Sequence, residues 1–147
     1  PQELATQSWQ EVLDDPHTTE ENAADVRRLV LCSGKVYVDL AEVQANQSEF
    51  AVAVARVEQL YSFPGAEIEA VLTRYPNLEE VVWLQEEPAN MGAWEFMRWR
   101  LDEVINGRWP LRYIGRPRRA SPAEGSSAWH RRNQKAITEH AFKFEEE

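Results

Sequence analysis

The sequence predicts a three-layer α/β/α fold around a mixed, mostly parallel sheet of about five strands, and three observations support it. Segments with the length and composition of strands alternate with segments of helical spacing four times. Most of the strand segments are apolar throughout, which is typical of parallel strands covered on both faces. One further short segment near the N-terminus has no helix after it, so we expect it to lie antiparallel at an edge of the sheet.

Residues 9–13 are this edge-strand candidate, and Asp14-Asp15-Pro16 ends it before a polar loop that reaches residue 25. Residues 28–32 have the apolar continuity of a buried strand. Ser33-Gly34 then turns the chain into a helix, in which apolar residues at helical spacing share one face. These residues are Val36, Leu40 and Val43.

Residues 50–57, rich in alanine and valine, are the next strand. Pro64 stands where proline is favoured as the first helical residue, and Pro76 stops the helix that follows. The face that this helix turns to the core consists of Ile68, Val71, Leu72 and Tyr75.

Residues 81–84 form a strand that we expect to stop at the carboxylates of Glu86 and Glu87, and a helix opens at residues 92–94. That helix ends near Asn106-Gly107, and its apolar face carries Trp94, Met97, Leu101 and Val104. Residues 111–114 are the final short strand. A loop over residues 115–127 follows, and Ser126 or Ser127 caps a last helix that runs to about residue 142.

The chain length predicts one domain, because 147 residues can bury roughly 70% of the surface that the unfolded chain exposes. We divide the chain into an N-terminal lead-in with the possible edge strand, residues 1–25, and an α/β domain, residues 26–147. The chain begins with proline rather than methionine, so we expect a fragment of a longer protein.

The charge of the chain argues against general binding to nucleic acid or to an anionic membrane. The net charge is −9, whereas phosphate binding needs basic faces. Residues 14–21 and 145–147 are acidic and residues 112–132 are basic, so a local anion site is still open. The single cysteine, Cys32, fits a reducing cytoplasm. We find no signal peptide and no apolar run of about 18 residues, and so expect no membrane span.

Polar residues at the predicted carboxyl edge of the sheet are candidates for binding. Ser33-Gly34-Lys35 lies at a strand-to-helix turn whose N–H groups can hold an anion, although a plain helix start is the alternative. Residues 56–59 and 85–87 end two strands at the same edge. Adjacent strand residues point to opposite faces, so Glu86 and Glu87 are not expected to face each other. Ion pairing with arginine is the alternative to acid–base chemistry for these carboxylates.

Arg116, Arg118 and Arg119 are the best candidates for a nucleotide or acidic partner, because the guanidinium fork binds phosphate through two hydrogen bonds. The alternative is a solvated basic loop. The three histidines have no metal-ligand spacing, and no catalytic triad or zinc signature is recognisable. The sequence therefore predicts neither catalytic nor metal-binding residues in this chain.

Four blocks in order resemble one known family. Residues 26–37 read V-R-R-L-V-L-C-S-G-K-V-Y, residues 56–64 read R-V-E-Q-L-Y-S-F-P, residues 83–94 read W-L-Q-E-E-P-A-N-M-G-A-W, and residues 113–117 with 120–126 read Y-I-G-R-P and A-S-P-A-E-G-S. They resemble the C-terminal domain of the thiamine-diphosphate-dependent decarboxylase component of the 2-oxoglutarate dehydrogenase complex. Residues 10–16 are similar to the segment before that domain. Ser62, where the family more often has proline, is a departure.

The resemblance implies a part of an enzyme that is inactive alone. In this family thiamine diphosphate and magnesium lie in earlier domains, so no cofactor is expected on this chain. The full-length bacterial, cytoplasmic enzyme would oxidatively decarboxylate 2-oxoglutarate in the tricarboxylic acid cycle. Its implied partners are the enzyme's own upstream domains, a second copy in a homodimer and the succinyltransferase component. A weaker resemblance to the last domain of transketolase-like enzymes implies the same mixed sheet.

Some relatives also hold a regulatory nucleotide or acetyl-coenzyme A on this domain, which implies possible binding of acetyl-coenzyme A or AMP here. The matching residues are Ser33, Lys35, Arg56, Gln85, Arg116, Arg118 and Arg119. Two alternatives stay open: a stand-alone module that binds a nucleotide or acyl-coenzyme A, and a purely structural dimer-interface domain.

Overall fold

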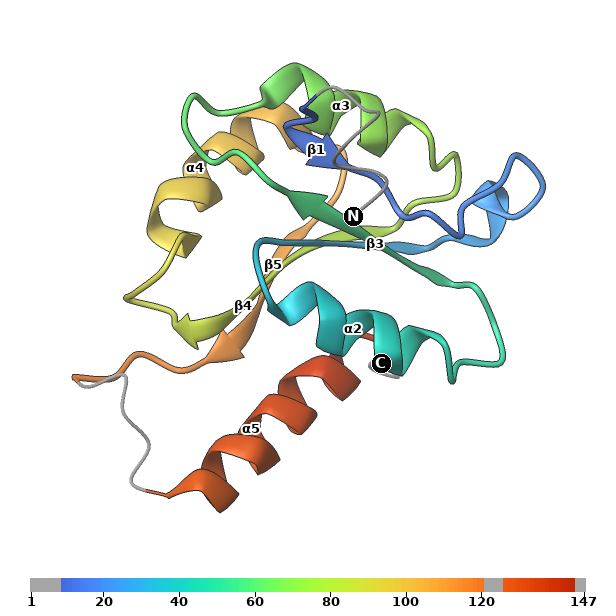
Figure 1. Ribbon diagram of the computed structural model, residues 1–147. Helices are drawn as coiled ribbons and strands as arrows, with labels where there is room; N and C mark the ends of the chain where they lie inside the picture. The colour runs from blue at the N-terminus through green and yellow to red at the C-terminus, as the bar shows by residue number, and fades with distance from the viewer. Residues whose placement is uncertain (1–8, 121–125, 145–147) are drawn as a thin grey trace.

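The computed structural model describes residues 9–120 and 126–144, which form a five-stranded sheet between two pairs of α-helices (Figure 1). The strands are β1 (Val12–Leu13), β2 (Arg28–Cys32), β3 (Val52–Val57), β4 (Glu80–Pro88) and β5 (Leu111–Arg116). The helices are the 3₁₀ turn η1 (Ala23–Asp25) and the α-helices α2 (Val36–Gln44), α3 (Gly65–Thr73), α4 (Trp94–Ile105) and α5 (Ser127–His140). None of the described helices is long and apolar enough to cross a membrane.

The sheet has the order β1-β3-β2-β4-β5, and only β1 runs antiparallel to its neighbour. Val12 lies opposite Val57 and Leu13 opposite Arg56. This confirms the mixed sheet with one antiparallel edge strand, although regular pairing covers two residues rather than the five predicted. The buried carboxylate of Asp15 follows β1 and accepts hydrogen bonds from the Val54 amide at 2.8 Å and the Gln44 side chain at 2.6 Å. The lead-in is therefore fastened to the sheet.

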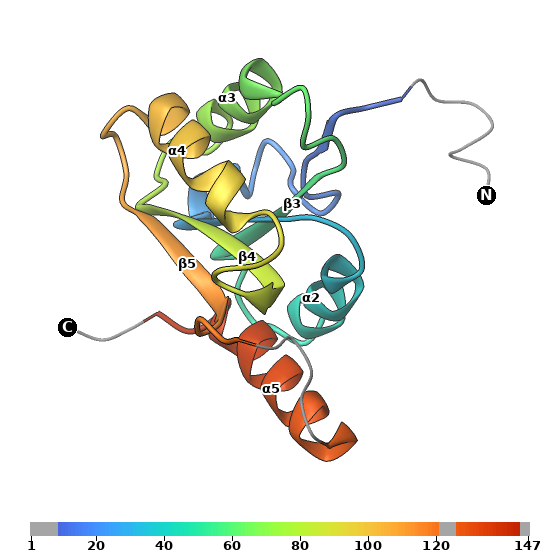
Figure 2. The ribbon, with the colours of Figure 1, turned by 90° about the vertical axis from the view of Figure 1, so that its left-hand side faces the viewer.

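Strand side chains alternate between two apolar cores, and each core lies under one pair of helices (Figure 2). The core below α3 and α4 contains Leu29, Leu31, Ala53, Ala55, Val81 and Trp83. The core below α2 and α5 contains Val30, Cys32, Val52, Val54, Val82 and Leu84. Both faces of the sheet are covered, as the uninterrupted apolar strands predicted.

The β4 strand is longer than predicted. It runs through Gln85, Glu86 and Glu87 to Pro88 rather than stopping at Leu84. Its pairing with β5 is irregular there, because Leu84 lies opposite Ile114 and Pro88 opposite Arg116. The residues between Leu84 and Pro88 form a bulge in the pairing with β5, and their polar side chains lie at the carboxyl edge of the sheet. The β5 strand correspondingly extends two residues beyond the prediction.

Smaller differences concern the ends of helices. The loop predicted up to residue 25 contains η1, and Pro64 precedes the first residue of α3 instead of occupying it. Asn106 adopts the left-handed conformation that ends α4, with φ of 49°, as the Asn-Gly signal predicted. Ser126 caps α5 by accepting from the Trp129 amide at 3.3 Å. Residues 121–125 of the predicted loop lie outside the described residues.

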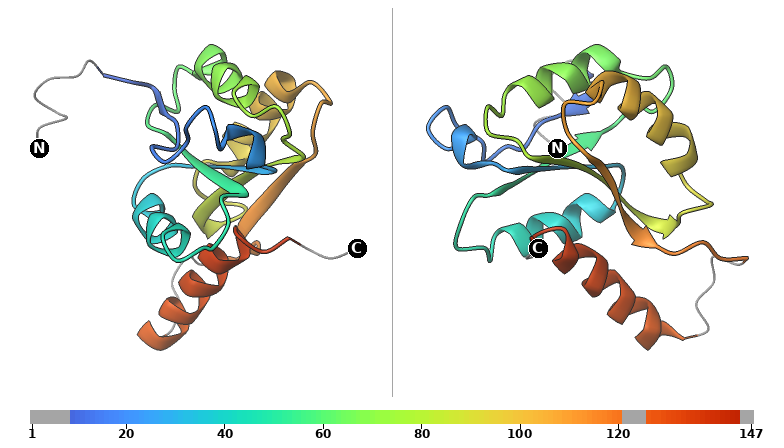
Figure 3. Two further views of the ribbon diagram at one scale, coloured as in Figure 1. Left: turned by 90° about the vertical axis from the view of Figure 1, so that its right-hand side faces the viewer. Right: turned by 180° about the vertical axis from the view of Figure 1, so that it is seen from behind.

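The apolar contacts of α5 with the sheet lie in its C-terminal half. Ile137 and Ala141 are buried against α2 and the sheet, whereas residues 128–132 are exposed. Its N-terminal half consequently extends away from the sheet, as Figures 2 and 3 show.

Candidate functional site

A pocket of about 490 Å³ lies at the carboxyl edge of the parallel strands, and we call it the edge pocket. The loop after β2 leads to α2 on one face of the sheet, and the loop after β4 leads to α4 on the other face (Figure 1). Such a divergence is the topological switch point at which open α/β sheets bind ligands. The edge pocket is lined by Ser33, Gly34, Leu60, Tyr61, Trp83, Gln85, Glu87, Gly92, Ala93 and Phe96.

The walls of the edge pocket are largely apolar, and the only charged group among the described lining residues is an acid. Leu60 and Phe96 are half-buried, and Tyr61 is 85% exposed. The exposed carboxylate of Glu87 makes no hydrogen bond or ion pair with any residue that the structure describes. No lysine or arginine is found among the described residues that line the edge pocket. The pocket therefore suits an apolar or cationic group better than a phosphate.

Gln85 holds the rim of the edge pocket together and is only 4% exposed. Its Oε1 accepts from the Trp83 indole at 3.0 Å and from the Trp94 amide at 2.9 Å. Its Nε2 donates to the carbonyls of Glu87, Pro88 and Met91, the last at 2.7 Å. Both lone pairs and both N–H groups are thus used within the protein. Gln85 shapes the pocket and has no hydrogen bond left for a ligand.

Tyr113 supports the same rim from β5. Its hydroxyl lies 3.1 Å from the Glu87 carbonyl and 3.0 Å from the Arg116 carbonyl, and its ring lies 5.2 Å from that of Trp94. Burial raises the pKa of Tyr113 to about 12, so its hydroxyl stays protonated and donates. Gly115 is required beside it, because a Cβ there would lie 2.3 Å from the Tyr113 oxygen.

A second polar cluster lies on the opposite face of the sheet, between α2 and α5. Lys35 reaches the carboxylates of Asp39 at 3.4 Å and Glu86 at 3.8 Å. The Gln134 amide on α5 bridges the same two carboxylates, at 2.9 and 2.7 Å. Glu86 and Glu87 therefore serve opposite faces, as their adjacency predicted.

The arginine candidates are also divided between the two faces. Arg56 stacks on Tyr37 of α2, with its guanidinium carbon 4.2 Å from the ring centre, and pairs with Glu58. Arg116 is 7% exposed and lies 3.1 Å from His130 Nδ1 on α5. Because arginine only donates, this nitrogen of His130 accepts.

The other two loop arginines lie towards α4. Arg118 pairs with Glu95 at 3.1 Å. Arg119 exchanges two backbone hydrogen bonds with the Asn90 side chain, both of 2.9 Å. Both side chains are exposed, so each guanidinium remains accessible to solvent.

The seven predicted binding residues consequently do not form one group. Ser33 and Gln85 belong to the edge pocket on the α3/α4 side, whereas Lys35, Arg56 and Arg116 lie on the α2/α5 side. The sheet separates the two sets. Sequence reasoning missed His130 and Gln134, because the docking of α5 against Glu86 and Arg116 is a tertiary event without a local signal.

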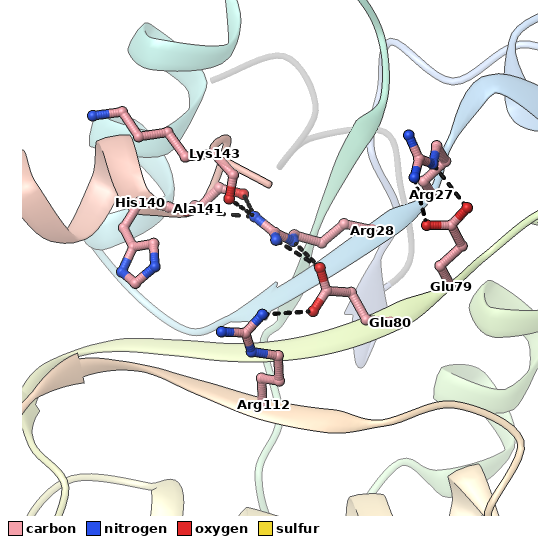
Figure 4. Close-up of polar contacts among 8 residues, drawn as sticks. All are labelled: Arg27, Arg28, Glu79, Glu80, Arg112, His140, Ala141 and Lys143. Atoms are coloured by element: carbon pink, nitrogen blue, oxygen red, sulfur yellow. Dashed lines mark hydrogen bonds and ion pairs between the residues drawn. The ribbon is translucent and has the colours of Figure 1, made fainter. Parts of the chain in front are cut away.

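A buried ion pair at the opposite end of the sheet fixes α5 (Figure 4). Arg28 is 2% exposed and donates to Glu80 at 2.6 and 2.8 Å. It also donates to the carbonyls of Ala141 at 2.7 Å and Lys143 at 2.9 Å, beyond the last residue of α5. Glu80 is shared with Arg112 at 3.4 Å. This arrangement satisfies carbonyls that a helix end leaves without partners.

The described residues offer no group of three or more His, Cys, Asp or Glu side chains that could hold a metal ion. Within the described ranges, the edge pocket also has no basic side chain to neutralise a diphosphate. The residues described here therefore do not fit thiamine diphosphate and its magnesium ion.

Comparison with known proteins gives consistent similarities. A family model described as "2-oxoglutarate dehydrogenase C-terminal" matches residues 1–142. The 2-oxoglutarate dehydrogenase E1 component of Exiguobacterium sp. is 44% identical over 138 residues, that of Cupriavidus necator 46% over 127 and that of Shouchella clausii 47% over 131. These matches cover 92, 86 and 88% of this chain but only 14, 13 and 14% of the relatives. The chain thus spans about one seventh of their length.

Proposed function

Because the chain belongs to the family of 2-oxoglutarate dehydrogenase C-terminal domains, we propose that it is the supporting C-terminal domain of a 2-oxoglutarate dehydrogenase E1 component. The observation that carries the proposal is 44–47% identity to such components over most of the chain. Among the described residues no group that could hold a metal ion is present and no basic side chain lines the edge pocket, which is compatible with the supporting role that we propose.

In this proposal the longer protein oxidatively decarboxylates 2-oxoglutarate, as a step of the tricarboxylic acid cycle in the bacterial cytoplasm. Thiamine diphosphate supplies the carbanion chemistry and is held with magnesium by other domains. The proposed partners are those domains, a second copy in a homodimer, and the succinyltransferase component of the complex.

The test compares the longer polypeptide with the 147-residue chain. We expect the longer polypeptide, supplied with thiamine diphosphate and magnesium, to release CO₂ from 2-oxoglutarate, and the 147-residue chain to release none. Release by the short chain, or none by the long one, would contradict the proposal.

We also propose that basic residues beside the second polar cluster bind a regulatory anion, either acetyl-coenzyme A or AMP. Lys35, Arg56 and Arg116 occupy the α2/α5 side of the carboxyl edge, near the N-terminus of α2. Arg118 and Arg119 are exposed on the loop that follows Arg116. A helix N-terminus and arginine forks both favour a phosphate. Ser33 and Gln85 line the edge pocket on the other face of the sheet and are not part of this proposed anion site.

Calorimetry on the longer polypeptide tests this second proposal. Acetyl-coenzyme A and AMP should give binding heat with the wild type and much less with Arg118→Ala/Arg119→Ala. Arg27→Ala, at the opposite end of the sheet, is the matched control and should bind as the wild type does. An absence of heat in the wild type would leave the purely structural dimer-interface role. Equal heat from the 147-residue chain alone would favour the stand-alone module.

A further inference from the structure

The antiparallel strand β1 determines where the chain enters this domain. The amides of Glu58 and Gln59, just past the carboxyl end of β3, donate to the Glu11 carbonyl at 2.8 and 3.1 Å. The residues before β1 therefore approach the carboxyl edge, whereas a parallel strand would have brought them to the opposite edge. Residues 9–11 therefore lie towards the edge that carries the edge pocket.

The same edge exposes large apolar side chains. Tyr61 is 85% exposed on the rim of the edge pocket, and Trp9, just before β1, is 69% exposed. Leu60 and Phe96 are half-buried in the pocket wall. Exposed apolar groups of this size around a hollow mark a surface that another protein segment covers.

The charge of the edge pocket specifies the chemistry of that segment. In the part of the chain that the structure describes, Glu87 is the only charged residue of the lining, and its carboxylate has no hydrogen-bond or ion-pair partner there. A lysine or arginine can lay its aliphatic stem on Leu60, stack on Tyr61 and place its charged head on Glu87. A phosphate would meet an acid there instead.

The much greater length of the relatives indicates which segment covers the edge pocket. This chain matches 13–14% of each E1 component, so most of such a polypeptide lies outside the structure. We propose that the preceding part of the same polypeptide docks on the edge pocket and Tyr61, and that one of its basic side chains pairs with Glu87. The inference rests on the proposed membership in a longer E1 component and adds the docking face and its central contact.

Site-specific photo-cross-linking in the longer polypeptide tests the inference. A benzoylphenylalanine at Tyr61 should cross-link, on illumination, to a peptide from the preceding part of the same chain, and the product should keep the mass of one chain. The Glu87→Arg charge reversal should lower the cross-linking yield roughly tenfold, because the new arginine would repel the basic side chain of the docked segment. The control Glu103→Arg makes the same charge change about two and a half turns into α4 and should leave the yield unchanged.

A second variant keeps the test decisive if Glu87→Arg merely disturbs folding. Reversing the basic residue found in the cross-linked peptide to glutamate should restore the yield in the Glu87→Arg background. Cross-links only to a second copy or to the succinyltransferase component, an absence of cross-links, or a failure of the paired reversal would each overturn the inference.

The outcome is separable from the proposed function. CO₂ release from 2-oxoglutarate is measured on the same wild-type preparation. Activity without the expected cross-link would refute the docking face alone. A cross-linked but inactive protein would refute the proposed activity and leave the docking face standing.

Discussion

Gln85 shows how one buried amide can determine the shape of a pocket. It connects β4 to the start of α4 through the Trp94 amide and to the intervening loop through the Met91 carbonyl. Few other side chains both accept twice and donate twice. A glutamate of the same size would offer no donor to the three carbonyls when ionised, so the amide itself is required.

We expect Gln85→Leu to lower the free energy of unfolding by about 3 kcal/mol, because it leaves several buried polar groups without partners. Urea unfolding of the 147-residue chain measures this. Gln47→Leu is the matched control, since Gln47 is exposed and donates only to the Val43 carbonyl; it should change stability by less than about 0.5 kcal/mol. Equal losses in the two variants would contradict the role assigned to Gln85.

At the scale of elements, the two halves of α5 are held differently. Its C-terminal half packs on the sheet, and carbonyls just beyond its last residue accept from Arg28. Residues 128–132 are exposed, and His130 among them reaches Arg116. Arg28 and Arg27 are adjacent on the chain and pair with Glu80 and Glu79 respectively (Figure 4), but of the two only Arg28 is buried. Substituting each of these two arginines in turn therefore separates the effect of burial on stability from the effect of charge.

Arg28→Met should destabilise the chain by about 3 kcal/mol, since it leaves the largely buried Glu80 with only the more distant Arg112. Hydrogen exchange should also speed up in the last turn of α5, whose carbonyl anchor is lost. Arg27→Met removes an exposed pair with Glu79 and should change both measurements little. Faster exchange spread evenly over the domain would argue against a local anchor.

Most elements could be predicted from sequence because their apolar periodicity is local. The strand at residues 28–32 and the helix that ends at Asn106 match the structure. The extension of β4 to Pro88 could not be predicted, because it depends on pairing with β5 across an irregular register. Polar residues after an apolar run give the same sequence pattern whether the strand ends there or continues through a bulge.

The candidate binding residues were predicted from one edge of the sheet, but the edge has two faces. Alternation along the strands could have separated Arg56 from residues facing α3 and α4, because Arg56 shares its parity with Val52 and Val54. No pattern in the sequence could place His130 beside Arg116, since the orientation of α5 depends on packing far from both residues.

At the scale of the whole molecule, two buried groups with raised pKa values, the Cys32 thiol and the Tyr75 phenol, make the stability of the fold depend on alkaline pH. Burial raises the pKa of the Cys32 thiol from 9.0 to about 12, with a smaller opposing effect from Arg56. Burial, together with the hydrogen bond to the Asp14 carboxylate, raises the pKa of Tyr75 above its ordinary value of 10.0. In both cases the folded state keeps a proton that the unfolded state has already lost.

The contribution of these two groups to the free energy of unfolding should therefore be level up to about pH 9 and fall above it. Between the unfolded pKa of Cys32, 9.0, and its folded pKa, about 12, the unfolded chain binds fewer protons, so rising pH favours unfolding by up to about 1.4 kcal/mol per pH unit for this thiol. Cys32→Ala should lower stability near pH 7 through the small cavity it leaves, yet decline less steeply from pH 9 to 11. Tyr61→Phe, which changes an exposed phenol, should follow the wild-type profile. Urea unfolding at each pH gives the slopes; parallel curves for Cys32→Ala and wild type would show that the thiol does not couple folding to alkaline pH.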